Sequence, residues 1–243
     1  MIAAAILYGF YAVASVLVAL VGFPWTWITG KVDLLYRMSM AVARTGLRLA
    51  GIRSEVRGLE NIPARSCILM SNHVSNLDPC VVIPPIPRRL AILVKSDLMR
   101  VPLLGPAMRL GSFIPIDREQ RESAISSLVT AKAVLDSGLS LAIFAEGTRS
   151  RDGKLLPFKK GPFYLAYEAG VPVVPISVSG TESMMRKGSA KIFPGTATVI
   201  YHPALDPKQF ATREDLMEAV RSAVASGLPA WMTQMTQPTQ PTT

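Results

Sequence analysis

Cysteine and histidine are both scarce in this chain, which has two of each among its 243 residues. Cys67 lies inside one apolar run and Cys80 starts another, so both are expected to be buried free thiols. Two cysteines are too few for a disulfide framework or a zinc site, and no metal is expected. This composition is typical of a globular part that faces the cytosol.

Acidic residues are outnumbered, with 17 against 26 basic residues, for a net charge of +9 and a pI near 9.8. A basic excess of this size suits a nucleic acid, an anionic membrane or an anionic substrate. The sequence shows no interleaving of basic and aromatic residues of the kind that RNA-binding proteins use. Its mean hydropathy is +0.32, so a membrane surface is favoured over a nucleic acid.

Charge is absent from the start of the chain, and no charged residue precedes Lys31. The apolar run Ile2–Phe23 would be about 33 Å long as a helix, enough to cross the hydrocarbon core of a bilayer. A signal peptide is a weaker alternative, because a basic start is missing and no clear Ala-x-Ala site precedes a mature domain. Pro24, Trp25 and Trp27 are expected to break this helix at a membrane interface.

The segment Val32–Gly51 is predicted to be a basic amphipathic helix, of the type that lies among lipid headgroups. Arginines recur on one face at steps of seven and four residues: Arg37, Arg44 and Arg48. Apolar residues form another row at steps of seven: Leu35, Val42 and Leu49. A surface helix of a soluble domain would show the same pattern, but its place after the apolar run favours a membrane anchor over residues 1–51. The basic side chains place this side in the cytosol.

Beyond residue 51 short apolar runs alternate with amphipathic stretches, which predicts an α/β domain over residues 52–230, with a single mixed sheet flanked by helices. The expected strands are Ser66–Met70, Leu90–Val94, Ser112–Ile116, Ser140–Ala145, Val171–Val178 and Ala197–Tyr201. The expected helices are Leu98–Leu110, Glu119–Ser137, Pro162–Ala169 and Arg213–Ser226. Thr212 and Asp215 resemble a capping box for the last of these helices. The Thr-, Gln- and Pro-rich residues 231–243 are predicted to be a disordered tail.

The stretch Ser71-Asn72-His73-Val74-Ser75-Asn76-Leu77-Asp78-Pro79 places a histidine between an apolar run and residues that start helices. His73 and Asp78 are five positions apart, or about 140° around a helix, so they would not share a helical face. In a loop, however, the aspartate can fold back onto the imidazole, fix its tautomer and leave the other nitrogen as a base. The alternative is that Asp78 only caps the next helix and His73 is an ordinary loop residue.

Three further motifs follow expected strands, and each has a structural alternative when taken singly. Asp117-Arg118 would be a surface pair, and Glu146-Gly147-Thr148-Arg149 a turn. Pro172 and Pro175 within Val171–Ile176 would mark an edge strand or an irregular strand.

In this order the motifs resemble those of the glycerolipid acyltransferase family, which includes 1-acylglycerol-3-phosphate acyltransferases. The resemblance covers roughly Gly58 to Pro203. Its blocks are N-H-x-S-x-x-D at Asn72–Asp78, the Asp-Arg block ending at Arg118, E-G-T-R at Glu146–Arg149, V-P-x-x-P at Val171–Pro175, and a lysine segment with Lys95, Leu98, Pro102 and Gly105. Ala145 departs from the family, where proline is common before the glutamate; this change is expected to alter turn rigidity and not the reaction.

The resemblance implies a transfer of an acyl chain from acyl-CoA or acyl carrier protein to the sn-2 hydroxyl of lysophosphatidic acid, with no acyl-enzyme and no cofactor. His73 would be the general base and Asp78 would orient it. The cations expected at the acceptor phosphate are Lys95, Arg118 and Arg149. The supporting motif residues are Asn72, Ser75, Glu146, Gly147, Thr148 and Gly161. Among these, Glu146 is expected to hold the arginines in place, Thr148 to bond the phosphate or cap its turn, and Gly161 to mark a candidate oxyanion hole.

Two other classes of function stay open from the sequence. The same chemistry could use glycerol 3-phosphate, another lysophospholipid or a glycolipid, although the short chain and close motif spacing favour lysophosphatidic acid. A non-catalytic membrane protein that binds anionic lipid would need the anchor but not His73 with Asp78. A serine hydrolase is disfavoured, because Gly-x-Ser-x-Gly is absent. The expected location is the cell membrane, with the catalytic domain on the cytoplasmic face.

Overall fold

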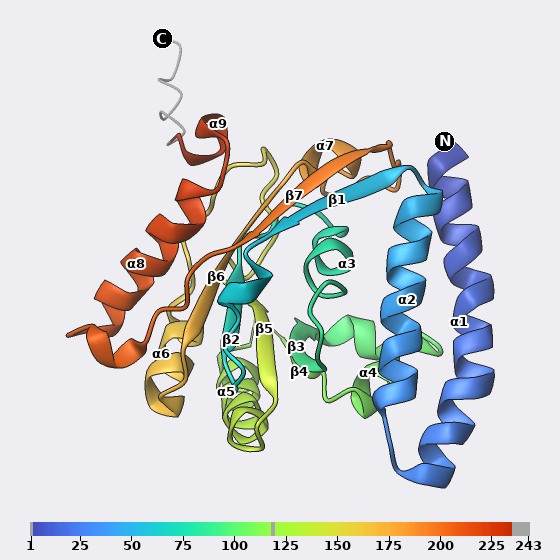
Figure 1. The fold of residues 1–243 in the computed structure, drawn as a ribbon, viewed down its shortest axis with the longest axis horizontal. Helices are drawn as coiled ribbons and strands as arrows, with labels where there is room; N and C mark the ends of the chain where they lie inside the picture. Colours follow the sequence, from blue (N-terminus) through green and yellow to red (C-terminus); the bar gives the residue numbers. More distant parts are fainter. Residues whose placement is uncertain (1, 118–119, 235–243) are drawn as a thin grey trace.

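The computed structural model describes residues 2–117 and 120–234, and the strands in this part form one seven-stranded sheet of order β1-β7-β6-β2-β5-β3-β4 (Figure 1). Neighbouring strands are parallel except β6 and β7, which are antiparallel, so the predicted mixed sheet is confirmed. The strands are β1 (Ile52–Arg57), β2 (Ile68–Ser71), β3 (Leu90–Lys95), β4 (Ile114–Ile116), β5 (Ser140–Phe144), β6 (Val173–Ser179) and β7 (Gly195–Tyr201).

Helices cover both faces of the sheet (Figure 1). They are α1 (Ile2–Thr29), α2 (Asp33–Leu49), α3 (Asp78–Val82), α4 (Leu104–Leu110), α5 (Arg121–Asp136), α6 (Lys160–Ala169), α7 (Thr181–Met184), α8 (Arg213–Ser226) and α9 (Ala230–Thr233). Short 3-10 helices are η1 (Leu59–Asn61), η2 (Ser96–Arg100) and η3 (Pro207–Gln209). Helices α1, α2, α3 and α7 contribute to the core on one face, and α5, α6, α8 and α9 to the core on the other.

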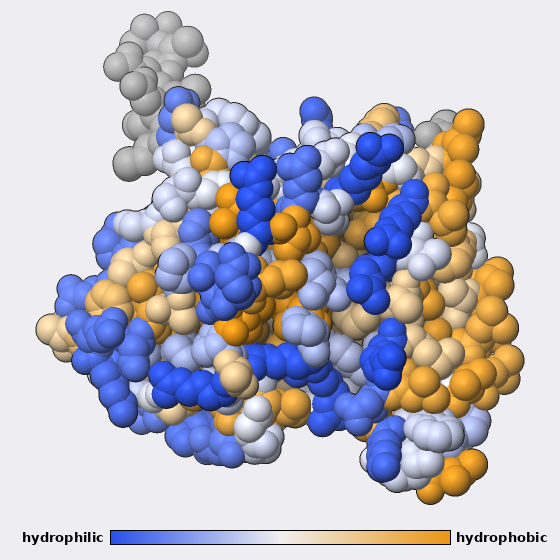
Figure 2. All heavy atoms as spheres, viewed as in Figure 1, coloured by the Kyte–Doolittle hydropathy of each residue, from blue (hydrophilic) through white to orange (hydrophobic). Residues whose placement is uncertain are grey.

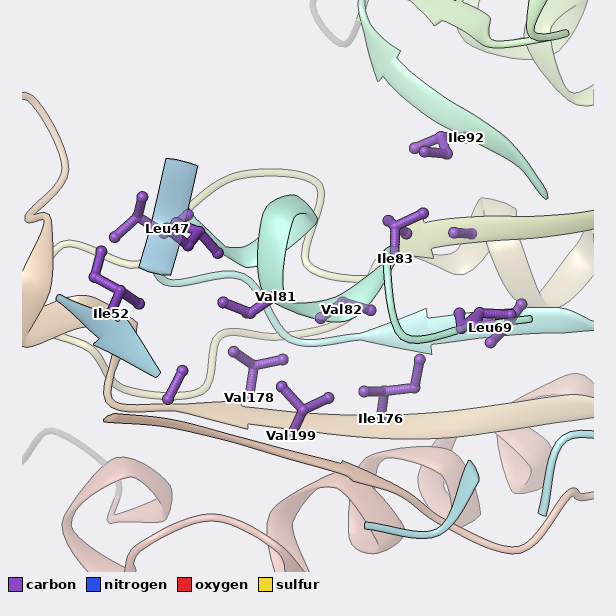
Figure 3. Close-up of a cluster of buried hydrophobic side chains, with 14 of the residues drawn as sticks. Leu47, Ile52, Leu69, Val81, Val82, Ile83, Ile92, Ile176, Val178 and Val199 are labelled. Atoms are coloured by element: carbon purple, nitrogen blue, oxygen red, sulfur yellow. The ribbon is translucent and has the colours of Figure 1, made fainter. Parts of the chain in front are cut away.

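The two cores are made by side chains that alternate along the central strands. On β2, Leu69 packs toward the α1–α3 face, whereas Ile68 and Met70 pack toward the α5–α8 face. Figure 3 shows the first of these cores, where side chains of α2 and α3 meet those of β2, β6 and β7. Burial on both faces gives β2, β5 and β6 their continuous apolar sequences, which is why these strands were detectable from the sequence.

The six predicted strands are confirmed, but β1 was missed, and β6 is not the edge strand that its prolines offered as an alternative. In β1 only Ile52 is buried, so its polar sequence gives no strand pattern. Strand β6 is central and not an edge, although it contains Pro175. The N–H of Val173 points to the β7 side, where it donates to Leu205 O, and Pro175 lies on that same side. Pro175 has no N–H to donate on that side. This costs no hydrogen bond of the β6–β7 pair, because the pairing of these strands starts one residue later, at Ile176.

The predicted helix Leu98–Leu110 is wrong as a single element, because the chain forms η2 and then α4. Pro102 disfavours helical geometry in the preceding residue, and Val101 is indeed extended. Leu103 then has a φ of 60°. The turn also needs Gly105, since a Cβ there would lie 2.1 Å from the carbonyl oxygen of Met99.

Helices α1 and α2 form an antiparallel pair, and α1 continues through Pro24 to Thr29, so the predicted break is wrong. Backbone bonding resumes after the proline, with Gly30 N–H donating to Thr26 O. Two glycines permit close approach: a Cβ on Gly22 would lie 2.6 Å from Leu35 Cδ1, and one on Gly46 would lie 2.2 Å from the Tyr11 ring. The face of α1 against the protein is a narrow stripe: Leu7, Ala14, Val18, Gly22 and Thr26.

The remaining surface of α1 is apolar and exposed. Its exposed large side chains include Ile2, Val13, Leu17, Leu20, Val21, Trp25, Trp27 and Ile28. Figure 2 shows this surface as a hydrophobic band along the right-hand edge of the molecule, where Figure 1 places α1. By length and composition α1 is the one candidate membrane span in the described part of the chain. An apolar surface of this extent is typical of a helix that contacts lipid.

Two smaller predictions have mixed outcomes. Both cysteines are free, as expected, but Cys67 is buried whereas Cys80 is only partly buried. The predicted disordered tail begins at residue 231, yet residues 231–233 belong to α9, where Met232 is fully buried. Residues 235–243 lie outside the described part.

Candidate active site

The candidate site lies at the carboxyl ends of three adjacent parallel strands. His73 follows β2, Glu146 follows β5, and Thr181 follows β6. Because β2 lies between β5 and β6 and is parallel to both, the loops that leave these strands meet at one edge of the sheet. Open α/β sheets bind their ligands at such an edge.

His73 and Asp78 are hydrogen-bonded, with 2.7 Å between His73 Nδ1 and Asp78 Oδ2. The same carboxylate oxygen accepts the backbone N–H groups of Val74 at 2.7 Å and Ser75 at 2.8 Å. Asp78 is fully buried and is the first residue of α3, so it both orders the loop and meets the imidazole. An ionised Asp78 assigns the ring proton to Nδ1 and leaves Nε2 as a base.

The plane of the His73 ring is held by Phe144, the last residue of β5. The two rings stack with centroids 4.1 Å apart and an angle of 23°. Only 12% of the His73 side chain is exposed, so the ring has little freedom to turn. An apolar pocket of about 240 Å³ lies beyond Phe144 and is also lined by Gly147 and Gly161.

Asn72 and Ser75 fix the loop that carries His73, the first to β6 and the second to the end of α7. The Asn72 amide forms two bonds with the backbone of Val178, donating to its carbonyl at 2.9 Å and accepting its N–H at 2.8 Å. Ser75 Oγ donates to Met185 O at 2.8 Å. Both side chains are fully buried, which supports a structural contribution to the site.

Glu146 was expected to hold the arginines; among the described residues its carboxyl bonds two backbone N–H groups, and no salt bridge joins it to Arg149. Its Oε1 accepts the N–H of His73 at 2.8 Å, and its Oε2 accepts the N–H of Leu156 at 3.2 Å. Burial raises the pKa of Glu146 to about 8, against the effects of the two amide donors and of Arg221, which favour ionisation. Glu146 therefore ties the histidine loop to the segment around residue 156.

Cations gather on the loop after Glu146. Arg149 is partly buried, and no salt bridge holds its guanidinium within residues 2–117 and 120–234. Lys187 Nζ donates to Arg149 O at 2.7 Å and to Thr148 Oγ1 at 3.2 Å. Burial, together with the positive charges of Arg151 and Arg149, lowers the pKa of Lys187. Lys187 was missed from the sequence, since it lies in no motif and reaches this loop only through the fold.

Lys95 is not brought against His73. Lys95 ends β3, which is separated from β2 by β5, and its ammonium pairs with Asp97 on an exposed surface. Arg118 lies outside the described residues. Gly161 is in the first turn of α6 and lines the pocket beyond Phe144. The E-G-T-R turn requires its own glycine, because Gly147 has a φ of 70°.

A further residue was missed from the sequence: Thr181 Oγ1 donates to Asp78 Oδ1 at 2.5 Å. The two residues are 103 positions apart, and no local pattern signals their contact. No group of three or more His, Cys, Asp or Glu side chains that could hold a metal ion occurs in the described part of the chain.

The chain is similar to known acyltransferases in sequence and in structure. The model of a family described as acyltransferase matches residues 53–179. A 1-acyl-sn-glycerol-3-phosphate acyltransferase of Limnanthes douglasii is 33% identical over 222 residues, which is 90% of this chain and 78% of that protein. One of Pseudomonas aeruginosa is 38% identical over 158 residues, 65% of this chain and 61% of that protein.

Among solved structures, the 1-acyl-sn-glycerophosphate (LPA) acyltransferase PlsC of Thermotoga maritima superposes with a TM-score of 0.83. It is 26% identical, and the match covers 97% of each chain.

Glu146 should make the stability of the protein depend on pH. The folded carboxyl keeps its proton up to about pH 8, whereas an unfolded one loses it near its usual 4.5. The resulting stabilisation is complete below the lower value and is lost as the pH rises through the upper one. Glu146→Gln removes this titration. In thermal melts from about pH 5 to about pH 9, the melting temperature of the variant should therefore rise relative to that of the wild type as the pH rises. A difference in melting temperature that stays constant across this range would contradict the raised pKa.

Proposed function

This chain belongs to the acyltransferase family, and on that premise we propose that it transfers a fatty acyl chain from a thioester to the sn-2 hydroxyl of lysophosphatidic acid, which gives phosphatidic acid. The relatives with this printed activity support the proposal, and the single observation that carries it is the His73–Asp78 hydrogen bond beside a cationic loop. A histidine base and bound cations are what an acceptor with one hydroxyl and one phosphate requires.

The reaction needs a proton removed from the acceptor and returned to the leaving group. His73 Nε2 takes the hydroxyl proton while the oxygen attacks the thioester carbonyl, and Asp78 stabilises the imidazolium through Nδ1. When the tetrahedral intermediate collapses, the carbon–sulfur bond breaks and the thiolate receives the proton from Nε2. The acceptor itself is the nucleophile, so no acyl-enzyme forms. General-base catalysis supplies about 10²–10⁴-fold, and positioning supplies much of the rest.

The acceptor phosphate is assigned to the loop that carries Arg149. Its partly buried guanidinium has donors for a bidentate contact with phosphate oxygens, and Lys187 adds a positive charge from the chain after α7. Lys95, at the end of β3, stays in the proposal, and so does Arg118, on the evidence of its sequence motif alone. The fatty acyl chain is assigned to the apolar pocket that Phe144 lines. Phe144 also stacks on the His73 ring, so the pocket lies next to the proposed base.

The donor in this proposal is acyl-CoA or acyl carrier protein, and no cofactor takes part. Both donors are anionic, so the net charge of +9 does not separate them. Glycerol 3-phosphate, another lysophospholipid or a glycolipid is the alternative acceptor. A lipid-binding protein without catalysis would have no use for a histidine oriented by a buried carboxylate, and this geometry favours an enzyme.

The second histidine does not form a competing catalytic pair. Ser177 Oγ lies 2.7 Å from His202 Nε2, but its own proton is donated to Val224 O at 2.6 Å. His202 must then donate to Ser177 and cannot act as its base. Ser177 is also buried, so a serine hydrolase that uses this pair is not supported.

The catalytic domain is assigned to the cytoplasmic face of a membrane, with α1 lying in one leaflet. Helix α2 runs back alongside α1 and presents Arg37, Arg44 and Arg48 at its surface. If α1 crossed the bilayer, these arginines would be drawn into the hydrocarbon core, where each costs several kcal/mol (about 2.5–3.5 at the centre of an inserted helix). A helix with one face on the protein and the other in the leaflet avoids that cost.

The chain's two histidines provide a matched test of the reaction. In His73→Ala, thiol release from acyl-CoA in the presence of lysophosphatidic acid should fall by at least about a hundredfold, because the base is lost. His202→Gln is the control and should keep wild-type turnover, since His202 only holds Ser177. Purified protein and detection of phosphatidic acid by mass spectrometry make the result specific. Turnover of His73→Ala near that of the wild type would rule out the proposed mechanism.

Arg149 can be tested through the acceptor. Lysophosphatidic acid should be used far better than the matching monoacylglycerol, and Arg149→Ala should lower kcat/KM for the phosphate-bearing acceptor by roughly ten- to a hundredfold. Arg149→Lys should recover part of this loss, because a point charge cannot reproduce the bidentate contact. Lys132→Ala removes a cation that pairs with Asp136 on α5 and serves as the control. An unchanged ratio between the two acceptors in Arg149→Ala would show that this arginine does not bind the phosphate.

The one-leaflet position of α1 can be tested with thiol labels. In a chain whose two cysteines are replaced by alanine, Ile2→Cys and Ile28→Cys place single thiols at the exposed ends of α1. Both should react with a membrane-impermeant maleimide in inverted vesicles and neither in right-side-out vesicles. Arg57→Cys on β1 reports the orientation. Labelling of either end from the outer face would show that α1 crosses the membrane.

A further inference from the structure

Asp78 has a fourth hydrogen bond that the mechanism above does not use. Its Oδ2 serves the His73 ring and the N–H groups of Val74 and Ser75, whereas its Oδ1 accepts the Thr181 hydroxyl at 2.5 Å. Both Asp78 and Thr181 are fully buried. In the described part of the chain, Thr181 is the one side-chain donor to Oδ1.

The two carboxylate oxygens of Asp78 therefore have different partners, and the bond from Thr181 to Oδ1 determines that Oδ2 faces His73. The last torsion of an aspartate side chain is broad, so donors on one oxygen alone leave the carboxylate free to swing. A donor on the opposite oxygen fixes that torsion. It also satisfies the remaining acceptor of a charge that has no access to water, where an unmade hydrogen bond is costly.

Thr181 is itself placed by rigid backbone. It follows Gly180, which ends the chain leaving β6 and has a φ of 91°. A Cβ on Gly180 would lie 2.5 Å from Thr196 O on β7, so this glycine packs tightly against the neighbouring strand. The turn is closed by the N–H of Met185 donating to Thr181 O. The hydroxyl therefore approaches Asp78 from β6 and β7, and not from the histidine loop itself.

We propose that Thr181 is a positioning residue for acyl transfer: its hydroxyl holds the Asp78 carboxylate in the orientation that binds His73 Nδ1. This inference rests on the proposed function. Thr181 is fully buried and bonds Asp78, so in this proposal it acts on turnover and not on substrate binding. By fixing Asp78, it preserves the tautomer with a bare Nε2 and keeps the negative charge beside the imidazolium that forms during the reaction.

The test compares hydroxyl removal with its conservative replacement. Thr181→Val should lower kcat by roughly ten- to a hundredfold, the size of one hydrogen bond to a charged group, while KM for both substrates stays unchanged. Thr181→Ser restores the hydroxyl and should recover most of kcat. Thr212→Val is the matched control: it removes the cap of α8, so it should lower the melting temperature but leave kcat intact.

Coupling to Asp78 separates this role from a general effect on folding. In an Asp78→Asn background, Thr181→Val should cause no further loss of kcat, because the group through which it acts is already gone. Multiplicative losses in the double variant would overturn the proposal. So would folded Thr181→Val with wild-type kcat, or a Thr181→Ser variant as slow as Thr181→Val. If valine prevents folding, Thr181→Ala, which needs no room for a second methyl group, takes its place in every comparison.

The outcomes also distinguish this inference from the function on which it rests. A wild-type protein that releases no thiol with lysophosphatidic acid would reject the proposed function. An active wild type with an equally active Thr181→Val would reject only the role of Thr181.

Discussion

The candidate site depends on a single buried carboxylate. Asp78 has no access to solvent, and a charge in that position is tolerated only if protein donors replace the water it has lost. The donors come from the histidine loop after β2 and from the turn after β6, so these two neighbouring strands must be paired before the charge is satisfied. Strand order, the position of Gly180 and the clamp between Asn72 and Val178 all serve this one requirement.

A second buried carboxyl group, that of Glu146, lies close to Asp78, and the two groups differ in their hydrogen-bond donors. Glu146 accepts only two backbone amides, and the charge of Asp78 is one of the causes that raise the pKa of Glu146. Asp78 instead has four donors, including a histidine that can become positive. The structure therefore concentrates its negative charge at the ring of His73. Glu146 accepts the backbone N–H of His73, and Asp78 bonds its ring, so the two acids hold the main chain and the side chain of His73 respectively.

Local sequence patterns predicted many of the helices and strands, but they could not predict contacts between residues that are far apart in the chain. Helix α8 has the predicted bounds, because Thr212 and Asp215 form a capping box that marks its start. The central strands were found from their apolar runs, whereas β1 was missed because its face is mostly exposed. At the site, His73 with Asp78 could be inferred because both lie in one loop. Thr181 and Lys187 could not, since each meets its partner only after separate strands have been aligned. The bonds from Glu146 to the amides of His73 and Leu156 could not be predicted either, because proximity in sequence to Arg149 does not determine where a buried side chain points.

The order of the strands has a consequence for synthesis of the protein. Strand β2 emerges early, but its two neighbours, β5 and β6, are separated from it by long stretches of chain. Such non-local pairing carries a large loop-closure cost and is slow to form. Helix α1, by contrast, precedes every strand of the sheet in the chain, and its apolar surface does not depend on strand pairing. The nascent chain is therefore able to reach a lipid surface before residue 181 exists to complete the site. An apolar helix is therefore available for contact with lipid before the groups of the candidate site have been brought together.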